Sequence, residues 1–387
     1  MRADPIPEIQ RVPLEKMVLR IKILPAFQGR AVRDVLSRIL EPPSTEGVDT
    51  ALRRLQGVGA LYQNHALTPL GYHLAQLPVD VRIGKLMLFG AIFRCLDAAL
   101  TIAACLSYRT PFLSPFKERE AANKARLRFF AGNSDQLTTY KAYRAWATAA
   151  ANGQQAGWVF SQENYLGQKT LQMISQMKHQ FVELLASIGF VPNQLKAKDL
   201  DRAARGKGKI RKSLFSRETT IDQTVQGGAD AVVAVTGPAI NANNENNRVV
   251  SAVLCSALYP NIVKVNLVFR QENRLNHQTV LPKVLTPEQK YMQTATGAMA
   301  KPPNPEDLKF KTAVDGYVHL HPGSVTAKVV RSVLNITVSR PFLSSSFRFE
   351  TPYLVFHEKV KTSRVFVREV CLILGISFAI CPRCLSS

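Results

Sequence analysis

A run of ten residues, 359–368, combines residue types that bind phosphate groups. It reads KVKTSRVFVR and follows an apolar stretch, residues 353–357, that is typical of a β-strand. The centre of the run combines two cations with two hydroxyl donors, namely Lys361, Thr362, Ser363 and Arg364. A loop at the end of a strand would present these side chains to a phosphate group. A solvated charged loop is the alternative.

The whole chain is strongly basic, which fits a phosphate-rich partner. Its 387 residues include 50 Lys and Arg against 28 Asp and Glu, and the net charge is +22 at pH 7. Cations placed near phosphates release condensed counterions, so nucleic acid is the favoured partner and an anionic membrane surface is the second candidate. The longest apolar run, residues 370–381, is too short for a membrane span, which needs about 20 residues. Six cysteines without regular spacing fit a reduced, intracellular protein.

Patterns that support catalysis are missing from this sequence. The nearest match to the phosphate-binding pattern G-x-x-x-x-G-K-[ST] is GKGK at residues 206–209, which lacks the spacing and the hydroxyl residue. The hydrolase patterns G-x-S-x-G and H-E-x-x-H and the zinc-deaminase pattern are missing too. We therefore expect no catalytic residue in this chain and no cofactor site of its own. Whether it forms part of an enzyme is left open.

Two groups of residues have the types that bind metal ions. Cys381 and Cys384 form a single C-x-x-C, whereas a structural zinc site needs four ligands, so we interpret both as free thiols. His319 and His321 would share one face of a strand, and we interpret them as a surface or RNA-facing pair. No metal site is expected.

The spacing of apolar residues predicts short helices at the start of the chain. Residues 14–21, 32–39 and 48–55 repeat them at intervals of three and four, and a short polar hairpin follows at residues 62–68. Three short helices and a hairpin indicate a winged-helix arrangement, which we place in residues 1–78.

A helical domain is expected next, in residues 79–195. The segment 74–106 is rich in apolar and small residues and predicts buried helices. Two helices with basic faces are predicted at residues 118–130 and 135–151, and a long amphipathic helix at residues 165–188. The expected domain is therefore a bundle of helices.

The composition then changes twice. Residues 196–246 are first rich in Lys and Arg, then in Gly, Ala and Asn, and predict a basic, disordered linker. Short β-type stretches, among them residues 329–338, predict a small β-barrel in residues 247–375 with a long proline-rich loop at residues 271–312. An apolar tail, residues 376–387, follows. The predicted fold class is multidomain α+β.

Several stretches of the sequence together resemble one protein family. They are IQRVPLE at residues 9–15, the segment 67–104 from LTPLGYHLAQLPVD to LDAALTIAA, and LYPN, HLHPGSV and YLVFHE at residues 258–261, 319–325 and 353–358. In these stretches the chain is similar to the C-terminal region of DEAH-box RNA helicases related to RNA helicase A. The resemblance implies a winged helix, a helicase-associated ratchet domain and an oligonucleotide-binding (OB) type barrel, in that order.

The resemblance also implies partners and a function. In that family these domains hold single-stranded RNA beside two motor domains, which bind ATP and magnesium. The motor motifs are not in this sequence, so we expect an RNA-binding accessory region of an ATP-dependent RNA helicase. Its expected partners are single-stranded RNA, the motor domains and activating proteins, with no membrane. A non-catalytic adaptor module from a truncated helicase is the alternative, and the expected compartment is the cytoplasm, with the nucleus second.

Individual RNA-facing residues can be carried over from the family. In the barrel they are the loop residues 361–364, and in the ratchet domain they are Ser134, Asp135, Asn164, Lys169 and Lys178. The family usually has His after Ser-Asp, where this chain has Gln136, and Arg at the positions of the two lysines. Lysine keeps the charge but loses the bidentate geometry of Arg.

The end of the sequence departs from the family. Family barrels finish with a further strand and a Trp-containing tail, whereas residues 371–387 form an apolar stretch that ends near Cys-Pro-Arg-Cys. We therefore expect an incompletely closed barrel, whose exposed strand edge would favour aggregation or pairing with a partner.

Overall fold

The computed structural model describes residues 7–191, 200, 231–267, 308–327 and 353–373. They belong to two compact units. The helical unit combines Met1–Pro111 with Tyr143–Asn246, and the barrel unit combines Phe112–Ala142 with Asn247–Ser387. The chain therefore enters the barrel unit twice, first with a short helical segment and then with the strands.

Four helices open the helical unit, and the apolar spacing predicts the first three of them. They are α1 Glu15–Ile23, α2 Val32–Leu36, α3 Thr45–Val58 and α4 Pro69–Gln76. A bridge between Leu61 and Leu67 marks the predicted hairpin. Thr68 fixes the start of α4, since its Oγ1 accepts a hydrogen bond of 2.9 Å from the Gly71 N. Gly71 cannot carry a side chain, because a Cβ there would lie 2.0 Å from the Ala60 O.

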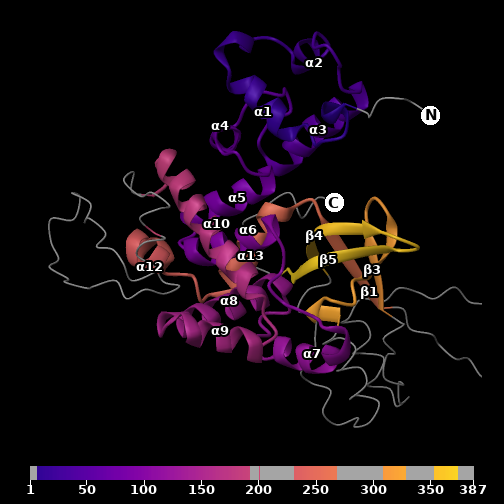
Figure 1. Ribbon diagram of the computed structural model, residues 1–387. Helices are drawn as coiled ribbons and strands as arrows, with labels where there is room; N and C mark the ends of the chain where they lie inside the picture. Colours follow the sequence, from indigo (N-terminus) through magenta and orange to yellow (C-terminus); the bar gives the residue numbers. More distant parts are fainter. Residues whose placement is uncertain (1–6, 192–199, 201–230, 268–307, 328–352, 374–387) are drawn as a thin grey trace, which may run out of the picture. The chain divides into compact units, whose positions relative to one another are not determined.

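Longer helices form the core of the helical unit (Figure 1). They are α5 Val81–Ile92, α6 Leu96–Ser107, the greater part of α8 Asp135–Ala151, α9 Gln154–Glu163 and α10 Gln168–Ser187, with the short α12 Ala231–Thr236. α6 contacts both α5 and α10 and is buried over most of its length. Gly90 of α5 permits this close packing, since a Cβ there would lie 2.2 Å from the Ala99 Cβ of α6. The predicted bundle of helices is confirmed.

Residues 231–246 are packed and partly helical, where the sequence predicts a linker. The Asn241 Oδ1 accepts a hydrogen bond of 3.0 Å from the Asp97 N, and the Asn244 Oδ1 accepts one of 3.3 Å from the Ala98 N. These N–H groups belong to the first turn of α6 and have no partner within the helix. The two asparagines cap α6 and so hold this segment against the helix. Most of the remaining predicted linker lies outside the described residues.

The barrel unit contains five strands in a closed barrel, in the order β1-β2-β3-β5-β4. They are β1 Ile262–Leu267, β2 Leu308–Thr312, β3 Gly316–Leu320, β4 Tyr353–Lys361 and β5 Val365–Leu372. Apolar side chains fill the interior, among them Val263, Val265, Val318, Leu320, Leu354, Phe356, Val367 and Val370. The predicted barrel is confirmed. The predicted open edge is corrected, because β4 pairs with β1 and so closes the described strands into a ring.

Two helices complete the described part of the barrel unit, α7 Arg119–Leu127 and α13 Asn247–Leu258, and α13 contacts β4 and β5.

β2 occupies residues 308–312, which were predicted as the end of the proline-rich loop. The predicted strand at residues 329–338 and the tail at residues 376–387 lie outside the described residues. None of the described helices is both long and apolar enough to span a bilayer.

Candidate nucleic-acid interface

The predicted phosphate loop is the turn between β4 and β5. Lys361 pairs with Val365 across this hairpin, so that Thr362, Ser363 and Arg364 form the turn. The Thr362 N donates a hydrogen bond of 3.0 Å to the Arg364 O, and the Thr362 hydroxyl contacts the same oxygen at 3.4 Å. Thr362 therefore shapes the turn. The side chains of Lys361, Ser363 and Arg364 are exposed.

The turn between β2 and β3 lies at the same end of the barrel, because β3 runs parallel to β5. Its acidic residue, Asp315, is already paired: the Lys359 Nζ bonds to its two carboxylate oxygens at 2.8 and 3.0 Å. This ammonium group, with the field of Lys361, lowers the pKa of Asp315. Among the described residues, Lys361 and Arg364 form no ion pair, so their charge is available to an anion.

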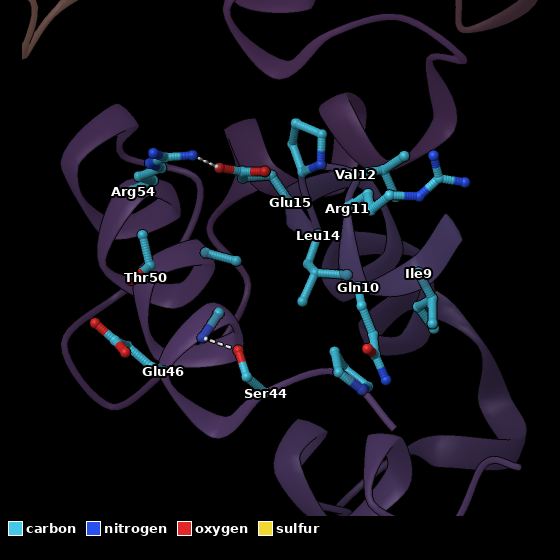
Figure 2. A pocket seen from close by; sticks show the side chains of 14 residues that line it. Ile9, Gln10, Arg11, Val12, Leu14, Glu15, Ser44, Glu46, Thr50 and Arg54 are labelled. Atoms are coloured by element: carbon cyan, nitrogen blue, oxygen red, sulfur yellow. Dashed lines mark hydrogen bonds and ion pairs between the residues drawn. The ribbon is translucent and has the colours of Figure 1, made fainter. Parts of the chain in front are cut away.

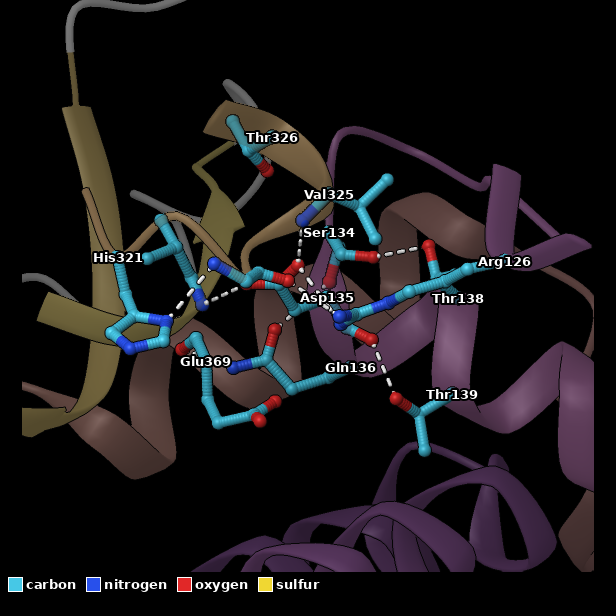
Figure 3. Close-up of polar contacts among 12 residues, drawn as sticks. Arg126, Ser134, Asp135, Gln136, Thr138, Thr139, His321, Val325, Thr326 and Glu369 are labelled. Atoms are coloured by element: carbon cyan, nitrogen blue, oxygen red, sulfur yellow. Dashed lines mark hydrogen bonds and ion pairs between the residues drawn. The ribbon is translucent and has the colours of Figure 1, made fainter. Parts of the chain in front are cut away.

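Ser134 and Asp135 lie at the start of α8 and are buried, with 0% and 1% of their surface exposed. The Asp135 carboxylate accepts hydrogen bonds from the Val325 N at 2.6 Å and the Val370 N at 3.1 Å, and lies 3.6 Å from the Arg126 guanidinium (Figure 3). Both carboxylate oxygens of Asp135 bind groups of the same unit, so the side chains of Ser134 and Asp135 are not presented to solvent, and their contact with RNA stays a prediction. Asp135 ties α8 to β5.

Gln136, the residue found in place of the expected histidine, belongs to the same polar cluster. Its Oε1 accepts a hydrogen bond of 3.0 Å from the Ser134 Oγ, and its Nε2 donates to the Glu369 O of β5. We call Arg126, Ser134, Asp135, Gln136 and Glu369 the α8 cluster. An amide side chain suits this position, because it accepts on one side and donates on the other.

Glu369 should make the stability of the protein depend on pH. Burial, with the nearby Asp135 carboxylate adding to it, raises the pKa of Glu369 to about 7, from an ordinary value of 4.5. Between these pH values the unfolded chain has lost a proton that the folded protein still holds, so stability should fall as the pH rises from about 4.5 to 7.

Urea unfolding at pH 5 and pH 8 would measure this effect. The Glu369→Gln variant should lose less stability than the wild type between the two pH values, because its amide does not ionise. An equal loss in both proteins would contradict the assignment. The comparison cancels the contribution of other carboxyl groups, which titrate in both proteins.

The three remaining predicted residues lie in the helical unit and do not form one surface. Asn164 is 7% exposed and its Nδ2 donates to the Phe160 O at 3.0 Å, at the end of α9. Lys169 is exposed on α10, whereas Lys178 is 1% exposed. Nine residues at about 100° each place these two lysines on opposite faces of the helix. Only Lys169 of these three residues presents its side chain to solvent, and the contact of all three with RNA stays a prediction.

Lys178 is part of a buried ion pair. Its Nζ pairs with the carboxylate of Asp97 on α6, which is 2% exposed, and lies 5.0 Å from the ring centroid of Tyr143. Burial raises the pKa of Tyr143, which keeps the phenol neutral beside the pair. Breaking a buried pair costs about 3–5 kcal/mol, so a phosphate would compete poorly with Asp97. In this structure Lys178 holds α10 against α6.

A cavity of about 390 Å³ lies in the helical unit between the residues before α1 and the start of α3 (Figure 2). Two bonds join residues that line it: Arg54 pairs with Glu15 at 2.9 Å, and the Ser44 Oγ accepts from the Gly47 N at 3.1 Å. The first bond joins the start of α1 to α3, and the second caps the start of α3. They account for the cavity as a structural feature.

The histidine pair lies on the barrel surface, as interpreted from the sequence. The rings of His319 and His321 flank that of Phe366, at centroid distances of 5.8 and 6.2 Å. Within the described ranges, no group of three His, Cys, Asp or Glu residues is placed to hold a metal ion. Cys381 and Cys384 lie outside the described residues.

The structure thus separates the predicted residues of the barrel unit. Asp135 contacts Val370, five residues along β5 from Val365 at the hairpin, a distance of about 16 Å at 3.3 Å per residue.

Sequence reasoning also missed three exposed lysines: Lys264 on β1, and Lys309 and Lys311 on β2. The alternation of Lys309, Phe310 and Lys311 was the available signal for a strand with one polar face.

Three sequence families match this chain, in an order that agrees with the fold. The "Helicase associated domain (HA2), winged-helix" family matches residues 51–79, and the "Helicase associated domain (HA2), ratchet-like" family matches residues 80–143. The "Oligonucleotide/oligosaccharide-binding (OB)-fold" family matches residues 250–377. The last match covers α13 from residue 250 onward and all five described strands.

Similar proteins from animals and plants carry names of helicases. The chain is 42% identical over 368 residues to the human "Putative ATP-dependent RNA helicase DHX57", and these residues are 95% of this chain and 22% of that protein. It is 33% identical over 366 residues to "DExH-box ATP-dependent RNA helicase DExH1" of Arabidopsis thaliana. It is 30% identical over 365 residues to the human "ATP-dependent DNA/RNA helicase DHX36". Each of these two matches covers 94% of this chain and 27% of the relative. The chain spans about a quarter of the length of these relatives.

Proposed function

Since this chain belongs to the DEAH-box RNA helicases, whose helicase-associated and OB-fold domains it contains, we propose that it holds single-stranded RNA while motor domains hydrolyse ATP. Its place is the C-terminal region of such a helicase. The ATP and magnesium of the reaction belong to the motor domains. The chain contributes binding and positioning of the strand.

The observation that carries this proposal is the exposed β4–β5 hairpin of the barrel. Lys361 and Arg364 project from a turn held by its own hydrogen bonds, and the one acidic group of the neighbouring turn, Asp315, is occupied by Lys359. An ordered cationic turn binds the phosphates that every RNA sequence shares. The proposed contact is therefore independent of sequence, which suits a protein that moves along a strand.

Binding of single-stranded RNA should weaken steeply as salt is raised. Each phosphate that a protein neutralises on a single strand lowers the slope of log affinity against log salt by about 0.7, so two to four contacts predict slopes of about −1.4 to −2.8. Filter binding of an unstructured RNA oligonucleotide over a range of salt concentrations would measure this slope. A flat response would overturn the proposal and favour the adaptor function.

The basic segment after the ratchet domain is the main source of ambiguity in this measurement. Residues 201–217 are rich in Lys and Arg, and a basic segment can bind any polyanion. A variant that lacks residues 201–217 is the matched control. Under the proposal it retains most of the affinity and a salt-dependent slope, because the hairpin is unchanged. Loss of all binding would place the interaction in the deleted segment.

A further inference from the structure

The outer surface of the barrel beside the hairpin has a regular chemical pattern. Along β3 the side chains of Val318 and Leu320 point into the core, whereas Tyr317 and His319 are exposed, and Tyr317 has 65% of its surface free. Phe310 of β2 likewise packs against the core, between two exposed lysines. Strands that alternate in this way present one row of residue types to the core and another to solvent.

The pairing of the strands brings these exposed residues together. Lys264 of β1 is opposite Lys311 of β2, and Lys311 is opposite Tyr317 of β3, so the three form one row across the barrel. His319 is level with Phe366 of the parallel strand β5. Tyr317, two residues earlier on β3, therefore lies toward the end of the barrel that carries the β4–β5 hairpin.

We call the outward-facing side chains of this surface the outer-face strip: the exposed Lys264, Lys309, Lys311, Tyr317 and His319, and the half-buried Phe366. Neighbouring strands are about 4.8 Å apart, so side chains opposite one another on this face are neighbours. Among the described residues, none of the three lysines forms an ion pair. The strip combines unpaired positive charge with an exposed aromatic ring and continues toward the β4–β5 hairpin.

We propose that the outer-face strip is a stacking surface for the bases of single-stranded RNA, with Tyr317 as its central ring and the lysines as phosphate contacts. The proposal rests on the proposed function and extends it, because the hairpin alone supplies only charge. A ligand that carries phosphates and flat rings at every repeat matches a surface that carries ammonium groups around an aromatic ring. An acidic peptide would match the charge but not the ring.

Stacking can be separated from charge by comparing two probes on the full chain. One is a 12-nucleotide oligouridylate, and the other is an oligomer of the same length that has the phosphate backbone but no bases. Stacking on an aromatic residue contributes about tenfold to affinity per base. The wild type should therefore bind the oligouridylate at least tenfold more tightly than the abasic oligomer.

The variant that tests the strip is Tyr317→Ala, and Tyr317→Phe is its matched control. Tyr317→Ala should lose about tenfold in affinity for the oligouridylate and bind the abasic oligomer as the wild type does. Tyr317→Phe keeps the ring and should bind both probes normally. Because Tyr317 is exposed, neither change should alter the fold, which the thermal unfolding midpoint would check.

The possible outcomes separate this proposal from the function on which it rests. If the wild type binds both probes equally and Tyr317→Ala changes neither, the stacking surface is wrong while RNA binding through the hairpin stands. If Tyr317→Ala weakens both probes equally, the residue acts on the fold or the backbone contacts, and stacking is again overturned. If the wild type binds neither probe, the proposed function itself has failed.

Discussion

Replacing Lys361 and Arg364 together by glutamate is expected to weaken the binding of single-stranded RNA by about tenfold or more at low salt. The two side chains are exposed at the tip of the β4–β5 hairpin, and neither forms an ion pair with any described residue. The double change removes two phosphate contacts and places two negative charges beside the strand. Since phosphates carry no sequence information, the loss should be similar for RNAs of different sequence.

The salt dependence gives a second measurement of the same variant. Loss of two phosphate contacts should make the slope of log affinity against log salt shallower by about 1.4. A matched control is the Lys124→Glu, Arg128→Glu variant, which changes two exposed cations of the same unit, one in α7 and one at its C-terminal cap. It alters the net charge equally but away from the hairpin. Equal losses in both variants would mean that net charge, and not the hairpin, sets the affinity.

The helices could be predicted because the residues that each helix buries recur at short, regular intervals in the sequence. The helix predicted at residues 135–151 is α8, and the long helix predicted at residues 165–188 is α10, Gln168–Ser187. Apolar residues at intervals of three and four identify a helix whatever it packs against. The barrel was predictable for a related reason, since its longer strands carry apolar runs such as that of β4.

The burial of single polar residues depended on partners that are distant in the sequence. Lys178 lies on the apolar face of α10, in step with Ile174 and Phe181, and this spacing was a usable signal against an exposed position. Its partner Asp97 could not be identified from spacing, because the pair forms only when α10 packs against α6. In the same way, Asn241 caps a helix that starts far from it in the chain.

The short strand β2 was not predicted, because its residues were assigned to a long loop. Its residues 308–312 follow a proline-rich segment, and a strand of this length has too few alternating positions to stand out. Pairing with β1 and β3 supplies the stability that its own sequence lacks. The omission also hid Lys309 and Lys311, and with them most of the charge of the outer-face strip.

Replacing Asp135 by alanine is expected to destabilise the barrel unit by about 3–5 kcal/mol. The change would leave two buried backbone donors, the N–H groups of Val325 and Val370, without an acceptor, and Arg126 without its carboxylate. Arg126 is itself mostly buried, at 12% exposed, and removal of one partner of a buried pair costs more than the pair contributes. Urea unfolding followed by circular dichroism would measure the loss.

The Asp135→Asn variant distinguishes a loss of charge from a loss of hydrogen bonds. Its amide can accept a hydrogen bond through only one oxygen, and its NH₂ group would face a backbone donor, so we expect a loss smaller than that of alanine but still more than about 1 kcal/mol.

Removing the carboxylate should also lower the pKa of Glu369, because the charge of Asp135 helps to raise it. The fall in stability between pH 5 and pH 8 should therefore be smaller in Asp135→Asn than in the wild type. A variant that loses stability but keeps the full pH dependence would show that the two carboxyl groups are not coupled, and would argue against the α8 cluster as one electrostatic unit.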